Sequence, residues 1–377
     1  MNSFIRINNF LPENSYIILN TMKILLIISI LFLLSCTKEV INENIKKQVL
    51  TNNPEPYKMQ DGEYVKYFNN GSIAIKTFYK SNKFNGKFIK YFKNGNIKEI
   101  GKFKNNKKDG LFKVFYNSGK LMSIKNYKSG KIHGKYIIFY KNGNKQLETT
   151  YTEGIRVGSW SSYYEDSQLF KKSFYKNGEL NGEFISFHEN GKISEKKYYV
   201  KGKLEGKHLT FKKNGILLDE TQYKNGELDG EHIIYHDNGK IKLKGSYKNG
   251  KAQGKFLKFY NNTKIESEYI FDDGVLEGEI KLFYKSGQLF RSGYFKKGKR
   301  NGEFRVYYSN GNLFKKEYFV NDLKQKEISA FYSDGTIIYK GNYKNDTPTG
   351  DWFYYYKSGE LEKKKNYNNF KYGTNIW

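Results

Sequence analysis

The chain has 377 residues but only one cysteine, Cys36, and only four prolines. A single cysteine excludes an internal disulfide framework and a metal site built on thiolates. The longest apolar run, Ile24 to Leu34, has eleven residues. It is too short to cross a bilayer as a helix and is typical of the core of a signal peptide. From residue 62 onward a helix is also disfavoured, because glycines or turn pairs interrupt the chain about every dozen residues.

In place of these features the sequence has a strict internal period. A pattern of 24 residues recurs thirteen times from residue 62 without an insertion or deletion. Such a period indicates a repeat array in which each unit packs only on its neighbours. Positions are numbered 1 to 24 within each unit, so that Gly182 to Glu205 is one unit and Lys326 is the only residue other than glycine at position 1. The glycines at position 1 are Gly62, Gly86, Gly110, Gly134, Gly158, Gly182, Gly206, Gly230, Gly254, Gly278, Gly302 and Gly350.

Each unit is interpreted as strand, tight turn, strand, tight turn. Positions 6 and 18 are aromatic in all thirteen units, and position 12 is aliphatic in all but one, which has Lys145. Asn-Gly pairs such as Asn190-Gly191 fill positions 9 and 10 and predict type I′ turns, and Ser167 and Thr263 replace this glycine in what we expect to be looser turns. Position 21 is Gly, Asn or Asp in all units but the last, where Phe370 replaces it, and this predicts a left-handed backbone there.

The period therefore predicts an all-β protein, an elongated single-layer antiparallel β-hairpin array of about 13 repeats of 24 residues. About 26 strands at ~4.8 Å each would extend on the order of 125 Å. Alternation would place positions 12, 14, 16 and 18 on one face of the second strand. A single layer must be covered by its own large rings, which accounts for 34 Tyr and 29 Phe.

The segment before the array predicts an anchor. Leu33-Leu34-Ser35-Cys36 resembles the lipobox of bacterial lipoproteins, in which a peptidase cleaves before the cysteine and lipid is attached to it. This resemblance implies lipidation of Cys36 and a place on a membrane of the bacterial cell envelope. We expect residues 1–36 to be the signal peptide, with Met22 as the interpreted start and Met1 as the alternative. Residues 37–61 are then a polar linker, 62–373 the array and 374–377 a C-terminal cap.

No catalytic or metal-binding constellation stands out in the chain. His188, His208, His232 and His236 occupy positions that hold Phe, Tyr or Trp in other units, and we interpret them as ring replacements. The acidic residues at position 2 alternate with lysine between units and predict a solvated face of mixed sign. No Ser-His-Asp arrangement, phosphate-binding glycine loop or HExxH motif occurs. We predict no enzyme activity, no metal and no cofactor.

The formal net charge of +28 points to anions as partners. Acidic phospholipid or anionic glycan would suit stripes of Lys and aromatic residues. Nucleic acid is disfavoured, because a secreted, lipid-anchored protein seldom meets it. The alternative is that the lysines keep an aromatic sheet soluble and protect its edges.

The unit also resembles a known family. Tyr307-Tyr308-Ser309-Asn310-Gly311-Asn312-Leu313 and its counterparts resemble the bacterial variant of the MORN repeat, often labelled as an antitoxin-like repeat. The similarity covers residues 62 to about 373. It implies a β-hairpin array that acts as a binding or scaffolding surface, in some members at membranes, and it carries no catalytic residues.

The leading hypothesis is a non-enzymatic, lipid-anchored scaffold for a protein partner. The alternatives are a binder of anionic glycan or phospholipid, and a cytoplasmic antitoxin that neutralises a toxin. We expect the binding face to be lined by the aromatic ladders of positions 6 and 18. The candidate residues are Tyr67, Tyr91, Phe115, Phe139, Tyr163 and Phe187 at position 6, and Tyr79, Phe103, Tyr127, Tyr151, Tyr175 and Tyr199 at position 18.

Overall fold

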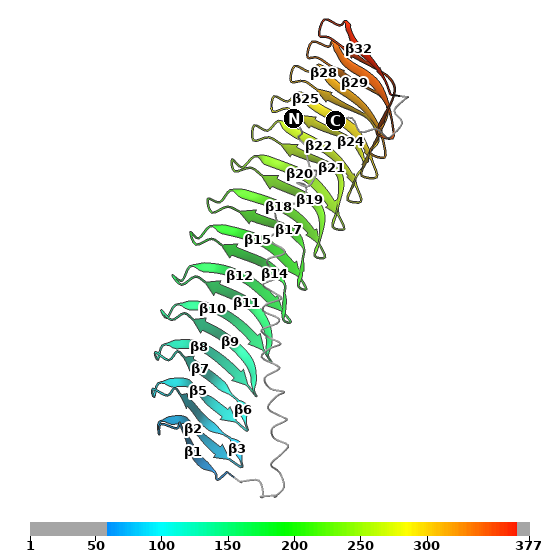
Figure 1. Cartoon of the computed structure of the whole chain (residues 1–377). Coiled ribbons are helices and arrows are strands. Elements are labelled where there is room, and N and C mark those ends of the chain that lie inside the picture. The colour runs from blue at the N-terminus through cyan, green and yellow to red at the C-terminus, as the bar shows by residue number, and fades with distance from the viewer. Residues whose placement is uncertain (1–58, 368–377) are drawn as a thin grey trace, which may run out of the picture. The chain divides into compact units, whose positions relative to one another are not determined.

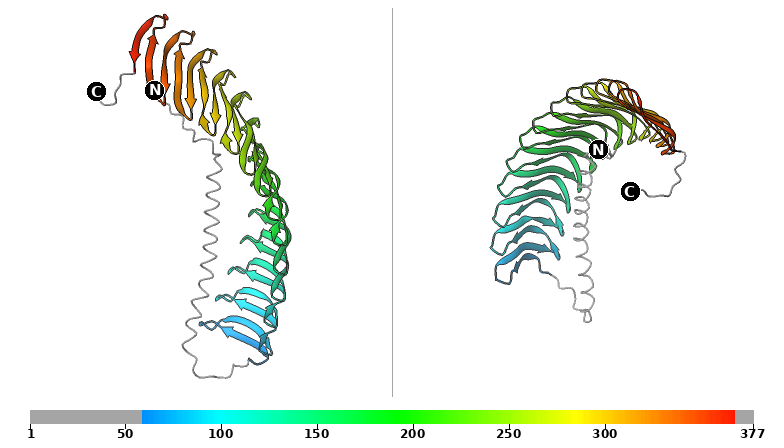
Figure 2. Two further views of the ribbon diagram at one scale, coloured as in Figure 1. Left: turned by 90° about the vertical axis from the view of Figure 1, so that its right-hand side faces the viewer. Right: turned by 45° about the horizontal axis from the view of Figure 1, so that its top comes forward.

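The structure, a computed structural model, describes residues 59–367 and consists there of one continuous antiparallel sheet. This range contains 32 strands and no helix, which confirms the predicted all-β, single-layer hairpin array. The hairpins follow one another along a curved sheet (Figure 1; Figure 2). Cys36, the expected signal peptide, nearly all of the expected linker and the 374–377 cap lie outside the described residues.

Each unit contributes two long strands, and six two-residue strands at positions 22 and 23 each precede the first strand of the next unit. Counting each short strand with the one that follows leaves the 26 strands expected. The first strands are β1 (Gly62–Tyr67), β3 (Lys83–Phe84) with β4 (Gly86–Tyr91), β6 (Lys107–Lys108) with β7 (Gly110–Phe115), β9 (Lys131–Phe139), β11 (Ile155–Tyr163), β13 (Glu179–Leu180) with β14 (Gly182–Phe187), β16 (Lys203–Leu204) with β17 (Gly206–Phe211), β19 (Glu227–Tyr235), β21 (Lys251–Phe259), β23 (Val275–Leu276) with β24 (Gly278–Phe283), β26 (Lys299–Arg300) with β27 (Gly302–Tyr307), β29 (Leu323–Phe331) and β31 (Thr347–Tyr355). The second strands are β2 (Ile73–Lys80), β5 (Ile97–Lys104), β8 (Leu121–Lys128), β10 (Lys145–Thr152), β12 (Leu169–Lys176), β15 (Ile193–Val200), β18 (Leu217–Lys224), β20 (Ile241–Lys248), β22 (Ile265–Asp272), β25 (Leu289–Lys296), β28 (Leu313–Val320), β30 (Ile337–Lys344) and β32 (Leu361–Asn366).

A β-bulge in every unit changes which residues share a face. In the first unit Lys66 pairs with Ile75 but the next residue, Tyr67, pairs with Ile73, so that Ala74 has no partner in the ladder. The same shift recurs in all thirteen units. The extra residue at position 13 reverses the alternation. The expectation that position 12 shares a face with position 18 is therefore wrong.

The sheet has two chemically different faces. Positions 3, 5, 7, 13, 14, 16, 18 and 23 form one face, called the ring face below. Positions 2, 4, 6, 12, 15, 17, 19 and 22 form the other, called the open face. Of thirteen buried apolar residues in the described part, ten lie on the ring face, and of eighteen exposed large apolar residues, fifteen lie on the open face.

The first turn differs from the predicted type I′ geometry. In the unit that starts at Gly86, Phe92 N–H donates to Asn96 O and Gly95 N–H donates to Phe92 O. Gly95 has a φ of 85°, while Asn94 is not among the residues of positive φ. This is a three-residue loop, a type I turn followed by one left-handed residue. Asn94 instead uses its side chain, since Oδ1 accepts the Asn96 N–H at 3.1 Å.

The two turns without glycine are not looser than the others, contrary to expectation. Ser167 and Thr263 take the left-handed conformation, with φ of 74° and 71°. Both retain the hydrogen bond of the turn, from Ser167 N–H to Tyr164 O at 3.0 Å and from Thr263 N–H to Tyr260 O at 2.9 Å. The array thus imposes the backbone of glycine on residues that do not favour it.

Type I′ geometry occurs at the second turn, at positions 20 and 21. In β15–β16, Val200 pairs with Lys203, and the two residues between them, Lys201 and Gly202, have φ of 48° and 75°. The left-handed backbone predicted for position 21 is confirmed there and at Asn82, Asn106, Asp322 and Asp346. Position 20 is left-handed as well, which its varied residues did not reveal.

We predict that Thr263→Gly stabilises the array. A β-branched residue at positive φ carries strain of about 1 kcal/mol that glycine removes. The melting temperature should therefore rise. Lys264→Gly, one residue later at a position that is not left-handed, should lower it, and equal effects of the two substitutions would contradict the assignment of strain to Thr263.

Candidate interaction surface

The ring face is closed by interlocking aromatic side chains. Phe304 at position 3 lies between Phe295 and Phe319, which hold position 18 in the preceding unit and in its own unit. The ring centroids are 5.7 and 5.2 Å apart with nearly perpendicular planes. Phe304 is only 1% exposed as a result. Edge-to-face contacts of this kind give a single layer an apolar interior.

Glycine at position 16 makes room for the next ring. A Cβ atom on Gly293 would lie 2.2 Å from the ring of Phe304, and one on Gly101 would lie 2.5 Å from the ring of Phe112. The same relation joins Gly341 to Trp352. These glycines allow the ring of the next unit to approach the backbone closely. They are not turn residues, because their φ is not positive.

The two predicted ladders do not form one binding face. The position-18 rings, for example Tyr79 and Tyr127, pack within the ring face against Tyr64 and Phe112. The position-6 rings lie on the open face, as shown by Tyr235 Oη, which is 3.5 Å from Glu220 Oε2 at position 15. Positions 6 and 18 differ because position 18 pairs with position 1, and position 6 has the opposite parity to position 1.

The position-7 side chains join successive units along the first turns. Tyr116 Oη donates to Phe139 O, 23 residues later, at 2.8 Å. Five further units have the same hydrogen bond between a position-7 tyrosine and the carbonyl oxygen 23 residues later. His188 and His236 place Nε2 2.9 and 2.8 Å from the corresponding carbonyl oxygen. Their interpretation as ring replacements is confirmed, since each imidazole takes the hydrogen bond of a phenol.

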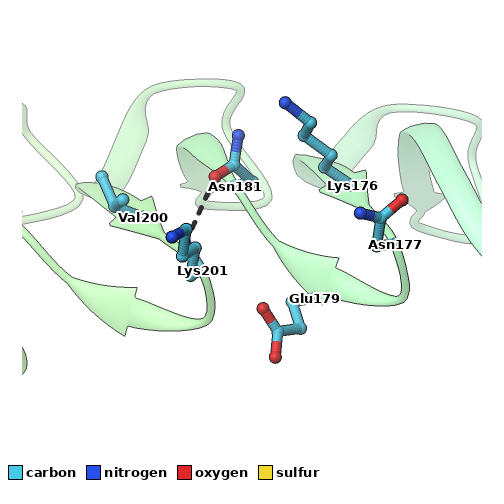
Figure 3. Close-up of a pocket in the computed structure, with 6 residues that line it drawn as sticks. All are labelled: Lys176, Asn177, Glu179, Asn181, Val200 and Lys201. Carbon is cyan, nitrogen blue, oxygen red and sulfur yellow. Dashed lines mark hydrogen bonds between the residues drawn. The ribbon is translucent and has the colours of Figure 1, made fainter.

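A second series of contacts joins the type I′ turns. Asn181 at position 24 accepts a hydrogen bond from Lys201 N–H at 3.2 Å, as Figure 3 shows. Asp229, Gln253 and Glu277 accept equivalent bonds in later units. The shallow pocket in Figure 3 is the gap between two such turns, and it also includes Lys176 and Glu179. It holds no nucleophile beside a base.

The open face carries complementary ion pairs between positions 2 and 15. Glu183 pairs with Lys196 at 2.6 Å, and Lys255 pairs with Glu268 at 2.9 Å, so the two charges are exchanged between units. Position 2 has the mixed sign that was predicted, and in these units its charge pairs with the opposite charge at position 15. Both partners remain about half exposed in the first case, and such surface pairs contribute little stability.

Exposed rings at position 17 were missed by the sequence reasoning. Phe174, Tyr198 and Tyr294 are 48%, 49% and 46% exposed. Each precedes the aromatic residue of position 18 in an aromatic pair, such as Tyr198-Tyr199. Because neighbouring strand residues point to opposite faces, the pair itself signals that one ring faces outward.

Two adjacent units replace the position-3 ring by a histidine beside a carboxylate. His208 Nε2 lies 2.9 Å from Glu195 Oε1, and His232 Nε2 lies 2.9 Å from Asp219 Oδ2. Burial would raise the pKa of Glu195, but hydrogen bonds from His208 and Lys197 outweigh it and lower the pKa to about 2. Burial opposes the ionisation of Asp219 too, and its bonds to His232 and Thr221 lower its pKa.

These histidines form no metal site in the described range. No group of three or more His, Cys, Asp or Glu side chains that could hold a metal ion occurs in residues 59–367. The same range has no helix that is long and apolar enough to cross a bilayer.

Fold and surface together define a β-hairpin repeat array with one closed face and one open face. The MORN repeat variant matches eleven segments of the chain, and the chain belongs to that family. The matched residues are 60–81, 84–105, 108–129, 132–153, 156–177, 180–201, 228–249, 276–297, 300–321, 324–345 and 348–369. The structure adds two units that the family pattern passes over, at β17–β18 and β21–β22.

No curated protein matches the chain. Among solved structures, "Crystal Structure of TcdB2-TccC3-Cdc42" is 11% identical with a TM-score of 0.15, over 80% of this chain and 19% of that one. "Crystal Structure of TcdB2-TccC3" is 11% identical with a TM-score of 0.14, over 84% of this chain and 21% of that one. This chain therefore spans about a fifth of those chains. TM-scores this low do not indicate a shared overall fold.

We predict that the Glu195 carboxylate stabilises the array in a pH-dependent way. Its folded pKa of about 2 lies below its ordinary value of 4.5, so the stabilisation is complete above that value and is lost as the pH falls toward 2. The difference in unfolding free energy between wild type and Glu195→Gln should be on the order of 1–3 kcal/mol at pH 6 and should shrink on acidification.

His208→Phe provides the matched control, because Phe is the residue at position 3 of the unit before it, as Phe184. Removing the imidazole should raise the pKa of Glu195 in a carboxyl NMR titration. A difference between wild type and Glu195→Gln that is constant from pH 6 to pH 2 would contradict the assignment.

Proposed function

We propose that this chain is a non-enzymatic scaffold of the bacterial cell envelope, held at the membrane by lipid on Cys36. Its repeat array would present the open face to a protein partner. The family supports a repeat scaffold, and the four-residue lipobox resemblance supports the anchor. No cofactor or metal is required by this role.

The observation that carries the proposal is the unequal exposure of the two faces. Rings on the ring face are covered by one another, whereas Phe174, Tyr198 and Tyr294 project from the open face at 46–49% exposure. Phe174 and Tyr198 belong to consecutive units, and so do the exposed Ile270 and Tyr294. Exposed aromatic and apolar side chains in neighbouring units form patches of the kind that marks protein interaction sites.

The polar groups of the described residues support a binding role and not catalysis. Four of the five histidines either replace tyrosine in a structural hydrogen bond or pair with one carboxylate on the ring face. The fifth, His133, lies at a type I′ turn beside Glu153. Carboxylates at position 2 of the open face, such as Glu183 and Glu231, pair with lysines. This arrangement leaves no nucleophile activated by a base and facing an oxyanion donor.

We predict that the mature protein begins at an acylated Cys36 and fractionates with membranes of its native host. Cys36→Ala should remove the lipid and release the chain from the membrane fraction. Intact mass and fractionation measure both results. A wild-type chain that is full-length, unlipidated and soluble would refute the anchor and favour a cytoplasmic antitoxin role instead.

We also predict that the position-17 rings contact the partner. The triple variant Phe174→Asn, Tyr198→Asn, Tyr294→Asn should fold normally, because Asn126 and Asn342 occupy position 17 in other units. Photo-crosslinking from position 198 in the native envelope should trap one specific protein, and the triple variant should lose it from pull-downs made at high salt.

Position 199 supplies the control for the crosslink, because Tyr199 packs on the ring face against Phe184. A photo-crosslinker there should trap far less of the same protein. Equal yields from positions 198 and 199, or a partner that the triple variant binds as well as wild type does, would refute the docking face.

A further inference from the structure

The positive charge of the array is concentrated in its first three units. Residues 62–133 contain 17 lysines and only three acidic residues, a net charge of +14. The remaining residues from 134 onward are more than three times as many and carry a net charge of only +13. Lysines are thus present along the whole array, but their excess over acidic residues is far denser in the first three units.

The excess charge includes a row of facing lysine pairs at the type I′ edge of the open face. Positions 19 and 22 pair directly across each turn. In the first three units both are lysine, as Lys80–Lys83, Lys104–Lys107 and Lys128–Lys131. In later units the pairs include Lys176–Glu179 and Lys224–Glu227, and facing lysines recur only singly, as Lys248–Lys251 and Lys296–Lys299. Three consecutive facing pairs therefore occur in the first three units alone.

These six lysines are exposed, and none has an ion-pair partner in residues 59–367. The nearby carboxylates Glu63 and Glu99 form ion pairs with Lys76 and Lys108 instead. Like charges directly opposite each other in a sheet are destabilising. Three such pairs follow at a repeat spacing of about 9.6 Å, twice the distance between strands.

A groove on the open face of the same units adds a second observation. It is lined by Lys87, Lys102 and Lys113 together with apolar side chains. Those apolar side chains are Ile97, Ile100, Leu111 and Phe115. Ile100 holds position 15 of the second unit and Leu111 holds position 2 of the third, so neither unit has the ion pair that joins these positions elsewhere. The groove therefore combines free ammonium groups with an apolar floor.

We propose that this surface, the lysine edge with the adjoining groove, binds an acidic linear polysaccharide that lies along the array. The regular row of ammonium groups fits acidic groups spaced along a chain, and the apolar floor fits the C–H faces of sugar rings. This function does not depend on the protein partner proposed above, which would use position 17 of later units.

The observations favour a glycan over the other polyanions. A membrane surface would gain from exposed apolar side chains at the same edge, but these occur only in later units, as Ile155, Val275 and Leu323. Single-stranded nucleic acid requires successive aromatic rings for stacking. The groove offers one ring, Phe115 of the third unit, and position 17 beside the lysine edge offers one more, Phe78 of the first unit. Position 17 of the next two units holds Lys102 and Asn126, so these rings do not follow one another in successive units.

The test measures binding of the full chain to polygalacturonate and heparin, with uncharged dextran, phosphatidylglycerol vesicles and a thymidine oligonucleotide as comparisons. We expect binding to both acidic polysaccharides that weakens as salt is raised from about 0.1 to 0.5 M. Replacing the six edge lysines by Gln should reduce the affinity at least about tenfold, because the local field is lost.

A second six-lysine variant has the same net charge as the edge variant and serves as its control. Six exposed lysines at positions 19 and 22 of later units are replaced by Gln, namely Lys176, Lys224, Lys248, Lys296, Lys299 and Lys344. Its affinity should change by less than about threefold, since these residues lie beyond the screening length from the first three units. Circular dichroism and melting establish that both variants fold, and the edge variant should melt no lower than wild type because it loses like-charge repulsion.

Equal losses in the two variants would show that net charge alone causes binding and would overturn the proposal. Absence of binding to both polysaccharides would also overturn it, as would tighter binding to vesicles or to the oligonucleotide. None of these results affects the crosslinking test of the protein partner, so the two proposals fail separately.

Discussion

Side chains of this array can be buried only by the strands beside them, because the described sheet has no second layer on either face. The ring of Phe304, placed between Phe295 and Phe319, is the contact that meets this constraint. It requires an aromatic residue at position 18 of each unit and a small residue, Gly293, beneath the ring in the preceding unit. Each unit is therefore completed by its neighbour, and none has a core of its own.

The turns extend the same dependence to the backbone. A tyrosine such as Tyr140 closes the first turn of its unit on the carbonyl oxygen of Tyr163 in the next. At the other edge, Gly202 N–H donates to Leu180 O of the preceding unit. Because both edges are tied across units, a local conformation is set by the array even where the residue resists it, as at Thr263.

Much of the architecture could be predicted from the sequence because the constraint repeats. Position 18 is aromatic in every unit, and position 21 is Gly, Asn or Asp in the first twelve, for the reasons now visible in the structure. The faces could not be assigned correctly, because the bulge at position 13 leaves no mark in the residues: Ala74, Phe170 and Glu266 all occupy it. Because the residue at position 13 is unpaired, position 12 lies on the opposite face of the sheet from the one predicted.

The turn types were misassigned for a related reason. Asn-Gly fits both a type I′ turn and a type I turn followed by a left-handed glycine, and only the number of residues between paired strands separates them. For the surface, the same bulge places positions 6 and 18 on opposite faces, because position 6 pairs with position 12. Aromatic pairs such as Phe174-Tyr175 do mark an outward ring in the sequence, whereas the histidine–carboxylate pairs depend on the register between units and leave no such mark.

In an array of this kind, a residue that follows the period reports packing, and only a departure from the period can report function. The departures at Thr263 and Lys326 keep the left-handed backbone of the glycines that they replace, with φ of 71° and 61°. Those of the open face change its chemistry: unpaired lysines gather in the first three units, and exposed rings gather at position 17 further along. Since neither feature improves the fold, and facing lysines oppose it, the stability of the closed ring face is what permits the open face to vary.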